Sequence, residues 1–152
     1  MKIAEFLRED LILPDLTATD KPGVLRELCV ALGRVHGLDP GRLTEVLLER
    51  EKLGSTGVGE GVAIPHGKLP GLNGVIGAFG RHVAGVDFDS LDGSPTHLFF
   101  LLVAPEDSVG QHLKALARVS RLLKDRAFRE KLIGAADRAE LFRLIREEDE
   151  KL

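Results

Sequence analysis

The sequence predicts an α/β fold in which a small mixed β-sheet is flanked by helices on both faces, as a single domain over residues 1–152. Three observations favour this class. Segments with helical spacing lie both before and after two strand-like segments. Residues 96–104 are apolar without alternation, which is typical of a central strand buried on both faces. A chain of 152 residues with 43% hydrophobic content is long enough for one core.

The first half is predicted to hold a short strand at residues 11–13 and then a helix over residues 20–37. Asp20 suits the N-cap, Pro22 the first turn and Gly37 the end of this helix. Its apolar face is predicted to consist of Val24, Leu28, Ala31 and Val35.

A second helix is predicted to open at Asp39 and Pro40. Its apolar stripe ends in a cation, and it consists of Leu43, Val46, Leu47 and Arg50. A planar guanidinium at this place is costly to bury without an anion. The alternative, that Arg50 turns to solvent or pairs with Glu49, Glu51 or Glu60, stays open on spacing alone.

The second half is predicted to hold strands at 74–83 and 96–104 and helices from 109 onward, around 128–133 and around 140–145. The helix from 109 onward has one apolar face, which consists of Val109, Leu113, Leu116, Val119 and Leu123. The charged residues 146–152 are expected to fray.

Composition excludes several classes of function. The net charge of −3 gives no basic excess for binding nucleic acid or an anionic membrane. The single cysteine, Cys29, forms no internal disulfide and is predicted to be a buried hydrophobe in a reducing compartment. The longest apolar run, residues 98–104, is far below the roughly 20 residues needed to cross a bilayer. We therefore expect a cytoplasmic protein that is not inserted in a membrane.

Residues 54–71 form a glycine-rich segment that matches no nucleotide motif. A P-loop lysine followed by Ser or Thr is missing, the spacing from Gly57 to Gly61 is not that of a dinucleotide fingerprint, and Ser55 lacks the context of a nucleophile elbow. A loop whose backbone N–H groups bind an anion remains. The alternative is that the glycines only serve a tight turn.

His66 stands between Pro65 and Gly67, a setting that suits an exposed reactive side chain. An imidazole with a pKa near 6.5 is partly neutral at cellular pH, so its ring nitrogen can attack phosphorus. The alternative is a loop histidine without chemistry. His112 is one helical step from Leu116, so on spacing alone it is better interpreted as a core histidine at the buried face or its edge.

The other histidines do not predict a metal site. His36 lies at a helix C-terminus, where the dipole favours a positive ring. His82 and His97 lie near strand ends, and a site that joins them to His66 would lack the usual metal-ligand spacing. No metal is expected.

The run REKLGSTGVGEGVAIPHGKL, residues 50–69, resembles the signature of enzyme IIA domains of the mannitol/fructose type from the bacterial phosphotransferase system. The nitrogen-type regulatory IIA proteins are the most similar branch. An Arg-Glu pair, a G-S-T-G-x-G loop and an A-I-P-H-G segment occur in order and spacing. The resemblance extends through HLFFLLVAP, QHLKALARVSRLL and AELFRLI, which is almost the whole chain.

This resemblance implies a site. His66 would accept the phosphoryl group, on Nε2 by family expectation, His112 would orient His66 or hydrogen-bond the phosphate, and Arg50 would stabilise the phosphate oxygens. Backbone donors of the loop would help, at Ser55, Thr56, Gly57, Gly59 and Gly61. No metal or cofactor is implied. Glu60 is expected either to hold Arg50 or to face water.

The resemblance also implies partners. The phosphoryl group would come from a phosphocarrier of the HPr type and pass to a IIB component or back. The nitrogen-type resemblance and the lack of IIB or IIC segments in this chain favour a regulatory output, in which phosphorylation controls binding to target proteins. The alternatives are a fructose- or mannitol-specific IIA component and a binding module without transfer activity.

Overall fold

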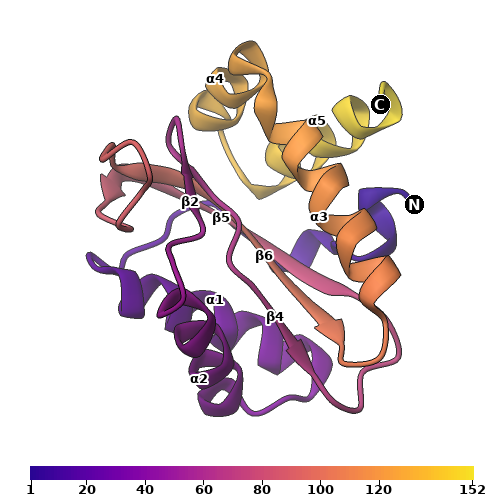
Figure 1. Ribbon diagram of the computed structural model, residues 1–152. Coiled ribbons are helices and arrows are strands. Elements are labelled where there is room, and N and C mark those ends of the chain that lie inside the picture. The colour runs from indigo at the N-terminus through magenta and orange to yellow at the C-terminus, as the bar shows by residue number, and fades with distance from the viewer.

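Six strands form one mixed sheet in the computed structural model, which describes residues 1–152 (Figure 1). The strands are β1 (Ile12–Leu13), β2 (Gly57–Gly59), β3 (Val62–Ala63), β4 (His66–Leu69), β5 (Ile76–Val86) and β6 (Thr96–Pro105). Their spatial order is β1-β5-β6-β3-β2, and β4 also pairs with β6. Because β5 runs antiparallel to β6 while β3 and β4 run parallel to it, the predicted mixed sheet is confirmed.

Helices cover both faces of this sheet, as predicted (Figure 1). The first layer consists of α1 (Lys21–His36) and α2 (Pro40–Glu51), and the second of α3 (Val109–Lys124), α4 (Arg126–Gly134) and α5 (Arg138–Glu150). Two short 3-10 turns, η1 (Ile3–Glu5) and η2 (Glu9–Leu11), precede β1. None of the helices has the length and apolar character required to pass through a bilayer.

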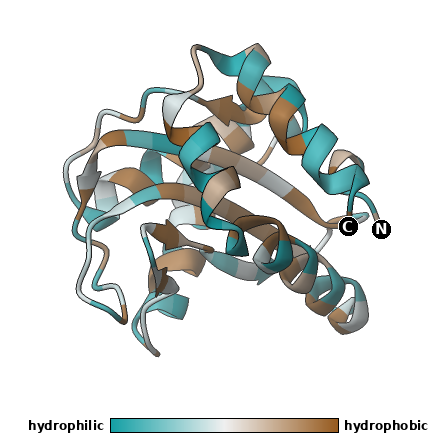
Figure 2. Cartoon of the chain, turned by 90° about the horizontal axis from the view of Figure 1, so that it is seen from above, coloured by the Kyte–Doolittle hydropathy of each residue, from teal (hydrophilic) through white to brown (hydrophobic).

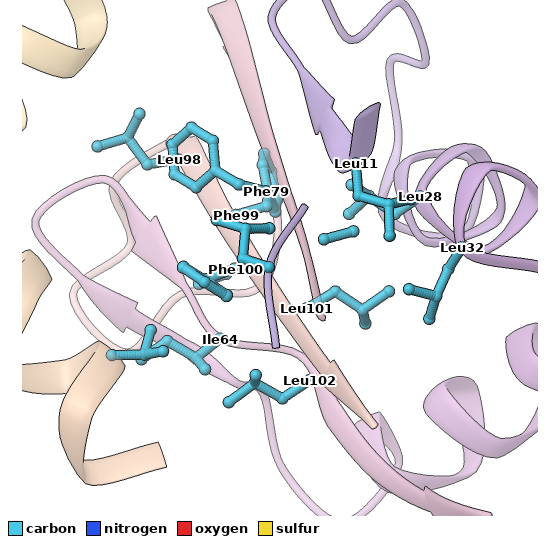
Figure 3. Packing of buried hydrophobic residues seen from close by; sticks show 14 of the residues in the cluster. Leu11, Leu28, Leu32, Ile64, Phe79, Leu98, Phe99, Phe100, Leu101 and Leu102 are labelled. Atoms are coloured by element: carbon cyan, nitrogen blue, oxygen red, sulfur yellow. The ribbon is translucent and has the colours of Figure 1, made fainter. Parts of the chain in front are cut away.

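Strand β6 is the centre of the core, as its unbroken apolar sequence predicted. Every residue from Leu98 to Ala104 is buried, because helices cover the strand on both sides. Phe79 and Phe100 meet edge to face with ring centroids 6.0 Å apart, and Leu101 points toward Leu32 of α1 (Figure 3). Hydrophobic segments accordingly follow the central strands, whereas hydrophilic segments lie on the outer turns of the helices (Figure 2).

The predicted start and end of α1 and the predicted start of α2 are confirmed. The Asp20 carboxylate accepts the N–H of Gly23 at 2.8 Å, and Gly37 closes α1 in the left-handed region with φ 68°. Asp39 caps α2 in the same way. The predicted apolar face of α1 is only partly right, because α1 packs against both β5 and α2. This wider contact buries three further hydrophobic side chains, Leu25, Cys29 and Leu32, while Ala31 and Val35 are only half-buried.

The glycine-rich segment is not one loop, because it contains β2, β3 and β4. Strand β2 pairs antiparallel with β3, and β3 and β4 then continue along β6 in a single register, with Val62 opposite Leu98 and His66 opposite Leu102. At the break between them, the N–H of Leu102 still donates to the carbonyl of Pro65 at 2.9 Å. His66 therefore lies on a strand rather than on the predicted loop.

The predicted apolar face of α3 is wrong in its first turns. Val109 and Leu113 are 53% and 61% exposed, whereas His112 is only 6% exposed. The buried side of the helix runs through His112, Ala115, Val119, Leu122 and Leu123. The reason is that the N-terminal turns of α3 face a cavity rather than the core.

The predicted fraying of residues 146–152 is also wrong, because α5 extends to Glu150. Asp149 is buried and forms an ion pair of 2.6 Å with Arg118 of α3. Its second carboxylate oxygen accepts the N–H of Ile3 at 2.8 Å. The end of the chain is therefore fixed to both α3 and η1.

Candidate functional site

A cavity of about 600 Å³ lies between the end of α2, strand β4 and the start of α3. The predicted site residues Arg50, His66 and His112 all line it, although they come from three different elements. Two further charged residues, Glu49 and Lys68, share the lining. The structure thus brings together the cation and the two histidines that spacing alone left apart.

His66 begins β4 with its ring half-buried. Its Nδ1 lies 2.8 Å from the carbonyl oxygen of Ile64. Because a carbonyl only accepts, Nδ1 carries the hydrogen and Nε2 holds a free lone pair. Nε2 has no hydrogen-bond partner and is not among the buried unpartnered atoms, so it is accessible.

The ring of His66 favours its neutral form. Burial lowers the pKa of His66 below its usual 6.5, and the positive charge of Arg50 lowers it further. The hydrogen bond to Ile64 and the charge of Glu51 act in the opposite direction. A neutral imidazole with an accessible Nε2 is a competent nucleophile.

His112 lies in the first turn of α3 and stands edge to face against His66, with ring centroids 5.6 Å apart and an angle of 74° between the planes. Its Nε2 is buried and has no hydrogen-bond partner. Burial lowers the pKa of His112, and the charges of His66 and Lys68 add to this effect. A buried ring nitrogen without a partner is rare in folded proteins and marks a place where a ligand atom can complete the hydrogen bond.

Arg50 lies in the last turn of α2, half-buried, and donates one hydrogen bond of 2.9 Å to the carbonyl of Gly54. It pairs with no carboxylate. Glu51 pairs with Lys21 at 2.8 Å, and Glu60 pairs with Arg129 at 3.3 Å. The other N–H groups of the Arg50 guanidinium remain available for an anion in the cavity.

The alternation of side chains along β4 explains how the two helical layers meet at this site. Gly67 faces α2, since a Cβ added there would lie 2.9 Å from Cγ1 of Val46. His66 and Lys68 therefore face the opposite layer, where α3 presents His112. Arg50, at the end of α2, lines the same cavity.

The glycine-rich residues predicted to bind phosphate do not line this cavity. The N–H and the hydroxyl of Thr56 both donate to Glu51, and the N–H of Gly57 donates to the hydroxyl of Ser55 at 3.0 Å. Gly59 lies beside Asp92, and Gly61 lies near His97. Their positive φ angles, 101° and 79°, serve the turn between β2 and β3. This placement favours the structural interpretation of the glycines.

Glu51 is a structurally important residue that the sequence interpretation did not assign to any role. It is buried, accepts two hydrogen bonds from Thr56 and forms the ion pair with Lys21. It thereby ties the end of α2 to the start of β2 and to α1. The Arg-Glu pair in the sequence was the only available signal, because the contact with Lys21 depends on how α1 packs against α2.

The remaining histidines lie away from the cavity. His82 bonds to the carbonyl of Ala18 at 2.8 Å, and His97 bonds to the carbonyl of His82 at 3.0 Å. Burial and the charge of Arg8 lower the pKa of His36, which opposes the effect expected of the helix dipole at the end of α1. No group of three or more His, Cys, Asp or Glu side chains is arranged to hold a metal ion.

An apolar collar surrounds the histidine pair, and it consists of Val46, Leu53, Val109, Leu113 and Leu116. Leu53 is 85% exposed, and Val109 and Leu113 are more than half exposed. Large exposed hydrophobic side chains gathered around a polar centre are typical of protein–protein contact sites.

Known proteins and one family model match almost the whole length of this chain. Residues 5–148 match the family model described as phosphoenolpyruvate-dependent sugar phosphotransferase system, EIIA 2. Over 145 residues the chain is 44% identical to a nitrogen regulatory protein of Bradyrhizobium diazoefficiens, with 95% of each chain covered. It is 38% identical over 150 residues to the fructose-specific EIIABC component of the phosphotransferase system of Bacillus subtilis, which covers 98% of this chain and 24% of that protein.

A solved structure agrees with these sequence matches. The nitrogen regulatory protein IIA-Ntr of Neisseria meningitidis superposes with a TM-score of 0.88 at 36% identity, covering 94% of this chain and 98% of that one. The fold and the order of elements are therefore those of a solved protein over nearly the full length of both chains.

Proposed function

The chain belongs to the EIIA 2 family of the phosphoenolpyruvate-dependent sugar phosphotransferase system, and from this premise we propose that it carries a phosphoryl group on His66. The observation that carries the proposal is the hydrogen bond from Nδ1 of His66 to Ile64, which leaves Nε2 unprotonated and accessible. Transfer to this nitrogen needs no prior loss of a proton, because Nε2 bears none.

Two neighbours of His66, Arg50 and His112, are placed to stabilise the transferred phosphoryl group. Arg50 has free guanidinium N–H groups for the phosphoryl oxygens. His112 has an Nε2 that lacks a partner, and its ring touches that of His66. Donors fixed before the reaction stabilise developing charge without reorganisation, so both residues lower the barrier to transfer.

The donor that fits this site is another protein, a phosphocarrier of the HPr type that bears its own phosphohistidine. The apolar collar offers a surface on which such a carrier can dock, with its phosphohistidine directed at the cavity. Transfer between two histidines requires the acceptor to lie in line with the breaking P–N bond, and docking provides that alignment. We place this relay in the cytoplasm.

The output that we propose is regulatory, through protein contacts that depend on phosphorylation. The 44% identity to a nitrogen regulatory protein over almost the whole chain supports it. The second candidate is a sugar-specific role with transfer to a IIB component, which the 38% identity to a fructose-specific component supports.

The carrier function is tested by incubating the protein with enzyme I, an HPr-type carrier and ³²P-labelled phosphoenolpyruvate. We expect one equivalent of acid-labile label on the wild type and none on His66→Ala. His112→Ala and Arg50→Ala should accept label more slowly while their circular dichroism spectra stay unchanged. His36→Ala is the matched histidine control, because His36 lies outside the cavity, and it should accept label at the wild-type rate.

Labelling of His66→Ala to the wild-type level, or no label on the wild type, would contradict the carrier role.

The output is tested separately by affinity capture with the phosphorylated protein and with His66→Ala. Partners that differ between these two states support the regulatory candidate. Identical partners in both states argue against it, and transfer of label to a IIB domain would favour the sugar-specific candidate.

A further inference from the structure

Lys68 is an exposed cation that lines the cavity. It lies two residues after His66 on β4, so both side chains leave the strand on the side that faces α3. The side chain of Lys68 is exposed and forms neither a hydrogen bond nor an ion pair. The only carboxylate in the cavity lining, Glu49, is already paired with Lys52 at 2.7 Å.

We propose that Lys68 is a phosphoryl-binding residue whose Nζ contacts an oxygen of the group on Nε2 of His66, an inference that rests on the carrier function proposed above. The shared cavity carries it, since alternation along β4 places His66 and Lys68 on the side that faces His112, and Arg50 lines the same cavity.

The charges of the site balance only when Lys68 is included. A phosphoryl group bound to histidine carries up to two negative charges near neutral pH. Arg50 supplies one positive charge, and the neutral His112 supplies none. Lys68, which lines the same cavity, supplies the second. Its charge already acts at this place, because it lowers the pKa of His112.

The transfer step fits this arrangement. The lone pair on Nε2 of His66 forms the new P–N bond while the P–N bond of the donor breaks, and the electron pair of that bond returns to the donor nitrogen. The proton on Nδ1 of His66 stays on its bond to Ile64 throughout. The three phosphoryl oxygens keep their negative charge in transit, so a mobile ammonium group can follow them from the donor to the acceptor.

The experiment uses two donors, the phosphorylated HPr-type carrier and phosphoramidate, a small molecule that needs no docking surface and releases ammonia. The variants are Lys68→Met, which keeps the length of the side chain without its charge, and Lys68→Arg, which restores the charge. Lys114→Met is the matched control, since Lys114 is an exposed, unpaired cation of α3 that does not line the cavity.

We expect Lys68→Met to accept phosphate about tenfold more slowly from both donors, because one charge-assisted contact is lost. Lys68→Arg should recover most of the rate, and Lys114→Met should match the wild type. The phosphorylated Lys68→Met protein should also lose its phosphate faster to water.

Three results would overturn the inference. Wild-type rates of Lys68→Met with both donors would remove Lys68 from phosphoryl binding and leave the carrier function intact. A slower rate with the protein donor alone would assign Lys68 to docking instead. A wild-type protein that accepts phosphate from neither donor would end the carrier proposal, and this inference would end with it.

Discussion

The carbonyl oxygen of Ile64 accepts a 2.8 Å hydrogen bond from Nδ1 of His66, two residues further along the chain. Pro65, which separates the two residues, has no N–H, and its own carbonyl is bonded to Leu102 of β6. The backbone alone therefore selects the tautomer of His66, and no acidic side chain is needed to orient the ring.

This hydrogen bond predicts which ring nitrogen is modified. Phosphorylation should occur on Nε2, because Nδ1 is occupied by its proton and by the Ile64 carbonyl. The measurement is a two-dimensional ¹H–¹⁵N spectrum of the protein labelled at its histidine nitrogens, recorded before and after phosphorylation. Phosphorus coupling to Nδ1 would contradict this prediction, because it would mean that the imidazole ring flips before it is phosphorylated.

The pH dependence of acceptance follows from the lowered pKa of His66. The fall in rate at low pH should have its midpoint below 6.5, the usual value for an imidazole, since protonation of Nε2 removes the nucleophile and the pKa of His66 is lowered. Arg50→Met should raise the pKa of His66 and move this drop to higher pH. NMR titration of the ring checks both statements. A lower pKa in Arg50→Met would contradict the sign of the effect.

Stability should depend on pH in the same range. The pKa values of His66 and His112 are lowered in the folded state, so the unfolded chain binds more protons just below pH 6.5. The contribution of the two neutral rings to the free energy of unfolding is complete above about pH 6.5. It is lost as the pH falls through the lowered pKa values of His66 and His112. Urea unfolding at several pH values measures this. In the double variant His66→Gln/His112→Gln, the dependence between pH 5 and 6.5 should be weaker.

Gly67 predicts a steric effect on the site. In Gly67→Ala the new Cβ would lie 2.9 Å from Cγ1 of Val46, a stiff β-branched side chain, so α2 must move away from β4. We expect a loss of about 1–3 kcal/mol in the free energy of unfolding and a severalfold slower transfer, because Arg50 moves with α2. The double variant Gly67→Ala/Val46→Ala should recover part of both. If the double variant is no better than Gly67→Ala, the clash with Val46 is not the cause.

Asp149 predicts a large effect on stability far from the cavity. Asp149→Ala leaves Arg118 without its carboxylate and the N–H of Ile3 without an acceptor. Breaking a buried ion pair in this way costs about 3 kcal/mol, which urea unfolding can measure. Glu147→Gln is the matched control on the same helix, because its pair with Arg143 is exposed and is worth less than about 1 kcal/mol. Equal effects would mean that the burial of Asp149 contributes nothing.

Local signals account for the parts of the fold that the sequence predicted. Asp20, Gly37 and Asp39 act on backbone groups within a few residues. Both ends of α1 and the start of α2 could therefore be predicted from the sequence. Strand β6 could be predicted because a strand that is buried on both faces has an unbroken apolar sequence. Strands β2 to β4 were missed because each has at most four residues, and glycines interrupt their pattern.

The parts that were missed depend on contacts between distant segments. Nothing near Val109 in the sequence shows that the first turns of α3 extend over a cavity, so Leu113 was placed in the core. Asp149 was placed in a frayed end because its partners, Ile3 and Arg118, are far away in the chain. At the site, the resemblance named His66, His112 and Arg50, and only packing showed that the three share one cavity and that Lys68 joins them.

The single register of β3 and β4 along β6 ties His66 to the most buried strand of the protein. Backbone in such a strand is among the last to open, so phosphorylation has little freedom to reshape what lies beneath it. The two states of the protein would then differ mainly in electrostatic potential over an almost unchanged surface. A partner that tells them apart must sense added negative charge at a rigid position, and ionic strength should tune how well it does so.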